Sequence, residues 1–152
     1  MKHLLILISF LLLTSPVIGD NHKGETLYGW GKCCDYKWMG FGDKETHSKY
    51  TGDVGNGVPN GFGIMIFPNG NKYIGDWKDG KWNGQGTFTT SNGSKYEGEL
   101  KNGERHGQGT HTYPDGSKYE GEYKDDWELN GTQYDKNGNI KYKYVNGKQI
   151  KQ

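Results

Sequence analysis

The chain has 152 residues, of which 19 are basic and 18 acidic, so its formal net charge is +1. Its single arginine is Arg105, and a nearly neutral, arginine-poor chain argues against a nucleic-acid partner. Beyond residue 19 there is no alanine and there are only three leucines, whereas aromatic residues are frequent. This composition favours strands over helices.

The first 19 residues have the pattern of a secretory signal. Lys2 and His3 precede the apolar run Leu4–Leu13, and small or β-branched residues lead to Gly19 before Asp20. The run is short for a membrane span, although an uncleaved anchor is the alternative. We therefore expect cleavage near Gly19/Asp20 and a secreted or periplasmic protein.

Tyrosine recurs every 23 residues, at Tyr50, Tyr73, Tyr96, Tyr119 and Tyr142. Glycines recur with the same period, as in the pairs Gly61/Gly63, Gly84/Gly86 and Gly107/Gly109. A fixed period indicates one structural unit that is copied and stacked, which excludes most enzyme folds with a single core. We divide the chain into a signal peptide (1–19), a leader with a degenerate N-terminal cap (20–49), four repeats (50–72, 73–95, 96–118 and 119–141), and a C-terminal edge strand with a tail (142–152).

Each repeat contains two turn signals. Asn56-Gly57, Asp79-Gly80 and Asn102-Gly103 form one series, and Asn69-Gly70, Asn92-Gly93 and Asp115-Gly116 form the other. Such pairs accept the positive φ angles of tight hairpins. The intervening segments have the length of strands, and polar and apolar residues alternate along them. The sequence therefore predicts an all-β fold, a single-layer antiparallel β-meander of stacked hairpin repeats.

Two regions depart from the pattern. In the fourth repeat Asp126 replaces the turn glycine, as is common in a terminal capping repeat. In the first repeat the segment 62–67 is apolar on both faces. Because such a strand needs cover on both sides, we expect Trp30, Trp38 and Phe41 of the leader to cover it.

The motif Tyr-x-Gly, then Gly, then Gly-x-Gly, then a Gly-containing turn resembles the MORN repeat (membrane occupation and recognition nexus). The segments Tyr73-Ile-Gly-Asp-Trp-Lys-Asp-Gly-Lys-Trp-Asn-Gly-Gln-Gly and Tyr96-Glu-Gly-Glu-Leu-Lys-Asn-Gly-Glu-Arg-His-Gly-Gln-Gly resemble it most closely. The resemblance implies a single-layer, twisted β-sheet that serves as a binding or spacing surface.

The candidate binding residues are aromatic side chains on one face of the sheet. These residues also provide the only available core, so part of the set must pack internally. A one-layer sheet leaves part of the face exposed, and exposed aromatic patches commonly mark binding surfaces. The candidates are Tyr73, Trp77, Phe88, Tyr96, Tyr113, Tyr119 and Tyr123.

The opposite face carries one lysine per repeat, and this lysine column consists of Lys49, Lys72, Lys95, Lys118 and Lys141. The column could bind anionic lipid headgroups. Glutamates alternate with lysines along the same strands, however, so the local field largely cancels, and an ordinary solvated face is the favoured interpretation.

No catalytic motif is present, and the histidines have no metal-ligand spacing, so we expect no catalytic residues, metal or cofactor. His111 is expected to pack on the aromatic face. Cys33 and Cys34 are adjacent. They could form a strained vicinal disulfide, pair with another chain or remain free.

These observations predict a non-enzymatic exported repeat protein. It would bind a protein partner, or itself, through the aromatic face or the sheet edges. The alternatives are a peripheral envelope-lipid binder that uses the lysine column, and a carbohydrate binder that uses the flat aromatic rings.

Overall fold

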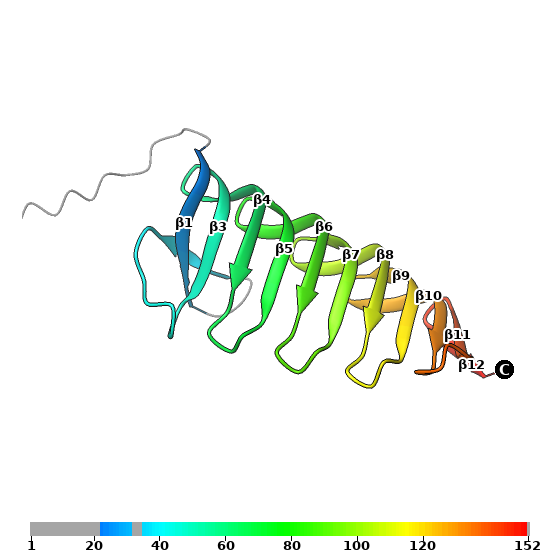
Figure 1. Cartoon of the computed structure of the whole chain (residues 1–152). Helices are drawn as coiled ribbons and strands as arrows, with labels where there is room; N and C mark the ends of the chain where they lie inside the picture. The colour runs from blue at the N-terminus through cyan, green and yellow to red at the C-terminus, as the bar shows by residue number, and fades with distance from the viewer. Residues whose placement is uncertain (1–21, 32–34, 152) are drawn as a thin grey trace, which may run out of the picture.

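The computed structural model describes residues 22–31 and 35–151 (Figure 1). No helix that could cross a membrane occurs in these two ranges. The predicted signal peptide and the Cys33-Cys34 pair lie outside them, so cleavage and the state of the two thiols stay predictions.

The described chain forms twelve strands in one sheet. Their bounds are β1 (His22–Trp30), β2 (Lys37–Met39), β3 (Ser48–Gly55), β4 (Val58–Ile66), β5 (Lys72–Lys78), β6 (Lys81–Thr89), β7 (Lys95–Lys101), β8 (Glu104–Thr112), β9 (Lys118–Lys124), β10 (Trp127–Tyr134), β11 (Ile140–Val145) and β12 (Lys148–Lys151).

All strand pairs are antiparallel, and from β3 to β12 each strand pairs with its neighbours in sequence. The predicted meander is therefore confirmed over this region. The N-terminal end differs, because β1 lies between β3 and β2 in the sheet. The C-terminal segment differs as well, since it forms the hairpin β11–β12 and not a single edge strand.

The tight turns have the backbone conformation that the sequence predicts. Asn56 and Gly57 have φ angles of 53° and 76°, and Asp79 and Gly80 have φ angles of 50° and 77°. Two successive positive φ values are the requirement of the two-residue hairpin turn that matches strand twist. In the fourth repeat Asp126 takes φ 70° in place of the glycine.

A row of glycines crosses the sheet at one level. Cα register pairs each of these glycines with a glycine on the next strand, and the row from β3 to β10 consists of Gly52, Gly63, Gly75, Gly86, Gly98, Gly109, Gly121 and Gly131. A Cβ atom added at Gly98 would lie 2.5 Å from both the Gln108 carbonyl oxygen and the Gly109 Cα. Since these are backbone atoms of the paired strand, no side chain fits at this level.

The repeating tyrosine lies across the glycine row of its own hairpin. A Cβ atom on Gly86 would lie 2.5 Å from the Tyr73 hydroxyl oxygen, and that hydroxyl donates a hydrogen bond to the Asp76 carbonyl oxygen at 2.9 Å. Tyr50, Tyr96 and Tyr119 make the same bond to the carbonyl three residues ahead. The strand register also shifts at this place, between Gly75 and Trp77, as at a β-bulge, which increases local bending.

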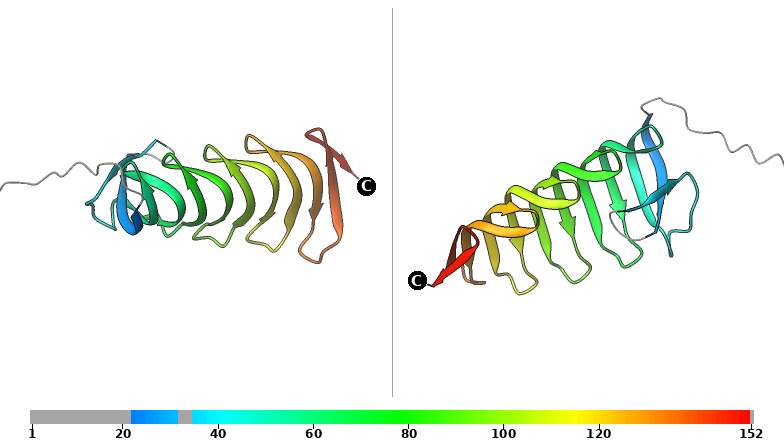
Figure 2. Two further views of the ribbon diagram at one scale, coloured as in Figure 1. Left: turned by 90° about the horizontal axis from the view of Figure 1, so that it is seen from above. Right: turned by 180° about the vertical axis from the view of Figure 1, so that it is seen from behind.

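Each hairpin consequently has two arms that meet at the glycine row (Figure 2). We name them the straight arm, which carries Tyr73 and Phe88, and the curled arm, which carries Trp77 and Trp82. Backbone hydrogen bonds connect successive curled arms. Gly80 N donates to Pro59 O at 2.9 Å, and Gly103 N donates to Trp82 O at 2.9 Å. The concave side between the two arms is called the inner groove below, and the other side is the outer face.

The core of this one-layer sheet lies in the angle between the arms. Its buried side chains are Leu27, Tyr50, Val54, Met65, Tyr73, Trp77, Tyr96, Leu100, Tyr119 and Tyr123. Neighbouring rings meet edge to face, as Tyr73 and Trp77 do with centroids 5.3 Å apart. Bending thus replaces the second layer that a flat sheet would need.

The expectation for the leader was wrong in part. Trp38 does cover the inner side, where its ring lies 5.8 Å from that of Trp77. The outer side of β4 has no such cover, since Phe62 is 55% exposed and Ile66 51% exposed. The reason is that β2 pairs only at the far edge of β1, at Tyr28–Trp30.

We expect the glycine row to be intolerant of any side chain. Gly98→Ala should lower the free energy of unfolding by about 2 kcal/mol or more, because the new methyl group meets backbone atoms that cannot move aside. Urea unfolding followed by tryptophan fluorescence measures this change. Gly40→Ala is the control, because its Cβ would meet nothing within 4 Å. Equal stability of the two variants would contradict the proposed steric requirement.

Candidate functional site

The inner groove contains a pocket of about 460 Å³ over the second and third repeats. We call it the central pocket. Side chains of both arms line it, so its shape depends on the bend at the glycine row. Its lining residues are Trp82, Phe88, Thr90, Asn92, Ser94, Tyr96, Leu100, Gly103, Arg105, His111 and Asp126.

One end of the central pocket is aromatic. The Trp82 ring stacks on Tyr73 with centroids 4.4 Å apart and an angle of 14° between planes. The centroid of the Phe88 ring on the straight arm lies 5.2 Å from that of the Trp82 ring on the curled arm. Both rings are only half-buried, so they present apolar surface to the groove while the buried tyrosine beneath holds the indole in place.

The other end contains Arg105 in a fixed orientation. Its Nε donates to Asp126 Oδ1 at 3.0 Å and its Nη2 donates to the Asp126 carbonyl oxygen at 2.7 Å. The guanidinium carbon lies 4.9 Å from the centroid of the Tyr123 ring. Asp126, which departs from the repeat pattern, thus orients the single arginine of the chain.

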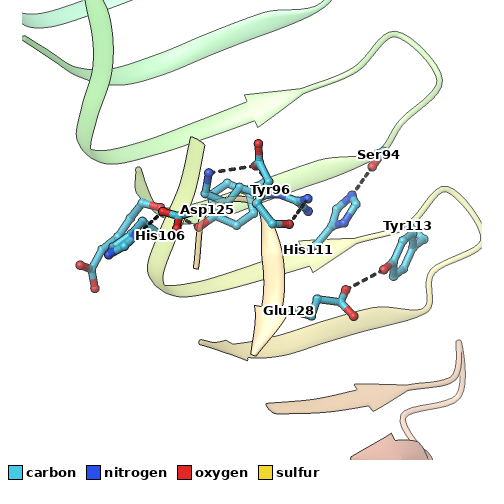
Figure 3. A network of polar contacts seen from close by, with 10 residues as sticks. Ser94, Tyr96, His106, His111, Tyr113, Asp125 and Glu128 are labelled. Atoms are coloured by element: carbon cyan, nitrogen blue, oxygen red, sulfur yellow. Dashed lines mark hydrogen bonds and ion pairs between the residues drawn. The ribbon is translucent and has the colours of Figure 1, made fainter. Parts of the chain in front are cut away.

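His111 lies on the inner face, as the sequence predicts. Its Nε2 is 2.7 Å from the Ser94 hydroxyl oxygen, and its ring centroid is 4.4 Å from that of Tyr113 (Figure 3). Burial, followed by the nearby charge of Arg105, lowers the pKa of His111. No three His, Cys, Asp or Glu side chains gather as a metal-binding group anywhere in residues 22–31 and 35–151.

Beyond the central pocket, the fourth repeat contributes a carboxylate to the same groove. The Tyr113 hydroxyl donates to Glu128 Oε1 at 3.2 Å (Figure 3). Burial and the Glu128 charge raise the pKa of Tyr113 to about 12, so the phenol remains a donor at physiological pH.

The seven aromatic residues predicted as a binding surface separate into two groups. The first group is at most 4% exposed and belongs to the core, so the prediction that these rings form an accessible face was wrong; it consists of Tyr73, Trp77, Tyr96, Tyr119 and Tyr123. The second group, Phe88 and Tyr113, is half-buried and faces the groove. Bending of the sheet, which alternation alone does not reveal, is the cause.

The lysine column follows the outer face. Lys95 Nζ lies 2.8 Å from Glu97 Oε2, and Lys118 pairs with Glu120. Each of these lysines is therefore neutralised by the glutamate two residues ahead on its own strand, as the alternation of charge indicates.

One row of groove residues was not predicted from the sequence. Pro59, Trp82, Arg105 and Glu128 occupy the same phase of the 23-residue period, and each pairs with the core residue of the curled arm: Val54, Trp77, Leu100 and Tyr123. The core row opposite also varies in residue type, but it stays apolar or aromatic. This row changes from apolar to aromatic to cationic to anionic, and the two charges at a fixed phase could have identified it.

The comparison with known families agrees with this architecture. The MORN repeat model matches residues 50–72, 73–95 and 96–118, which are three of the four segments expected from the tyrosine period. No curated protein matches the chain. The chain is a MORN-repeat protein, and repeats of this non-enzymatic type generally take part in protein or membrane-lipid interactions.

The lowered pKa of His111 makes stability depend on pH. The unfolded chain, with a histidine pKa near 6.5, binds a proton more readily than the folded chain. Stability is therefore full above about pH 6.5 and falls as the pH decreases towards the lower folded pKa. We expect His111→Phe, which copies Phe88 of the preceding repeat, to lose less stability than the wild type between neutral and mildly acidic pH. Urea unfolding at a series of pH values measures the difference, and identical pH profiles would contradict it.

Proposed function

We propose that the chain is an exported, non-catalytic adaptor that holds a protein partner in its inner groove. The observation that carries this proposal is the central pocket, where partly exposed aromatic rings lie beside an oriented guanidinium. Trp, Tyr and Arg are the residues on which binding energy concentrates at protein interfaces. Trp82 and Arg105 line the pocket, together with the buried Tyr96.

The form of the groove supports a protein segment as the ligand. The central pocket extends over the second and third repeats, and its lining combines apolar rings with hydrogen-bonding groups such as Ser94 and Asn92. Apolar pockets with a few oriented polar groups suit side chains of a bound segment, because the rings provide affinity and the polar groups set its position. The rigid core beneath the groove lowers the entropic cost of binding.

A membrane surface is the second candidate, and a specific observation on the outer face favours it. Ile66 pairs with Lys49 on one side and with Lys72 on the other, and Phe62, Ile64 and Ile66 are exposed. Exposed apolar side chains beside lysines are the features of a peripheral lipid contact. The patch covers mainly one strand, however, and Lys95 and Lys118 of the next repeats are paired with glutamates.

Two variants separate the groove from the outer face. Trp82→Ala should weaken retention of the partner by about 2 kcal/mol, as removal of an aromatic anchor does, whereas Lys95→Ala should cost less than about 1 kcal/mol because that lysine is in an exposed ion pair. The measurement is affinity capture from an extract of the source cells, with quantification of each captured protein by mass spectrometry.

Two controls accompany this measurement. Circular dichroism and urea unfolding must show that Trp82→Ala is folded, and vesicles of anionic phospholipid test the second candidate. The groove proposal is overturned in favour of the membrane by two results together. The protein binds the vesicles and this binding weakens with added salt, and a folded Trp82→Ala variant captures as much partner protein as the wild type.

A further inference from the structure

Glu128 lies at the C-terminal part of the inner groove and is half-buried. On β10 it is directly opposite Tyr123, the core tyrosine of the curled arm on β9. The Tyr113 hydroxyl bonds to one of its oxygens, Oε1. Glu128 occupies the phase that holds Arg105 in the preceding repeat.

The carboxylate has no cationic partner within the described part of the chain. The nearby ion pairs involve other acids: Arg105 with Asp126, Lys118 with Glu120, and His106 Nδ1 at 3.4 Å from Asp125. A half-buried carboxylate without a counter-charge is unfavourable. A positively charged group of a ligand would supply the missing counter-charge.

Four tyrosines surround this charge. Tyr119 contacts Tyr123 and Tyr144 edge to face, with centroids 5.1 Å and 5.3 Å apart, and Tyr113 completes the set through its hydrogen bond. Burial raises the pKa of each of the four phenols and the Glu128 charge raises it further, whereas Arg105 opposes the shift at Tyr113 and Tyr123. The buried Tyr123 hydroxyl has no hydrogen-bond partner among the described residues, a further polar group beside Glu128 that is left unsatisfied.

We infer that Glu128, with the half-buried rings of Tyr113 and Tyr144, forms a subsite for an ammonium group. Aromatic faces attract cations through their quadrupole, most strongly where water is partly excluded. The carboxylate, which the hydroxyls of Tyr113 and Tyr144 approach, supplies the opposite charge and an acceptor. An ammonium group on an alkyl chain fits both the rings and the carboxylate, because the alkyl chain packs on the rings while the ammonium group contacts the carboxylate.

The identity of the molecule that carries the ammonium group rests on the proposed groove function. We infer that the group belongs to a lysine side chain, unmodified or methylated, of the bound protein segment. Trp82 is on β6 and Glu128 on β10, four strand spacings or about 19 Å apart. An extended chain covers that distance in about six residues. A segment with an apolar anchor and a lysine about six residues away would therefore occupy the central pocket and the ammonium subsite together.

The subsite can be tested without the partner. Choline and Nα-acetyl-lysine methylamide are titrated into the whole chain, and tyrosine ring resonances are followed by NMR. We expect saturable shifts at Tyr113 and Tyr144 with millimolar affinity, which Glu128→Gln weakens about tenfold or more. Preference for choline indicates a methylated ammonium, and preference for the lysine compound indicates an unmodified one.

Matched variants separate charge from fold. Glu120→Gln removes an acid of the outer face that is already paired with Lys118, and should leave both titrations unchanged. Tyr113→Phe keeps the ring and should retain binding within about threefold. Absence of saturable shifts in the wild type, or equal affinity in folded Glu128→Gln, would overturn the inference.

The two proposals fail in different ways. If neither probe binds while Trp82→Ala still loses the partner, the ammonium subsite is wrong and the groove function stands. If the probes bind at Glu128 while Trp82→Ala retains the partner, the subsite stands and the groove function is wrong.

Discussion

Eight successive strands, β3 to β10, carry a glycine at the same level of the sheet, and the close approach of neighbouring backbones leaves no room there for a side chain. The freed space receives the ring of the repeating tyrosine, whose hydroxyl bonds to the carbonyl three residues ahead. The strand register shifts at this bond, and the hairpin bends. A steric constraint on one residue per strand, repeated along the chain, therefore determines the shape of the whole molecule.

The bend also explains how a single layer obtains a core. Tyr73 of the straight arm meets Trp77 of the curled arm across the angle, and both are almost completely buried. Side chains nearer the ends of the arms, such as Trp82, Phe88 and Arg105, remain partly exposed on the same concave side. The interaction that stabilises the fold thus also creates the groove, so that substitutions in the glycine row should affect stability and binding together.

Much of this architecture follows from the sequence, and the remainder has identifiable physical reasons. The tyrosine period and the Asn-Gly turns predict the strands, their pairing and their two faces, because these depend on neighbouring residues. The bend does not follow from alternation, since it arises where three residues of β6 lie opposite Asp76, as at the same place in the first and third repeats. The sequence predicts that part of the aromatic set packs internally, but not that Tyr96 and Tyr123 belong to that part. The contact between Arg105 and Asp126 joins different repeats, and the lone charge of Glu128 becomes evident only when its neighbours in space are known.

The central claim is that the concave side, not the outer face, is the working surface. Phe88 and Thr87 are consecutive residues of β6 that point to opposite sides, so a photoreactive phenylalanine analogue at each position compares the two faces with almost no other change. The measurement is the yield of cross-linked partner after irradiation of the assembled complex. The account predicts cross-links from position 88 and little or none from position 87. Cross-links from position 87 alone would contradict it.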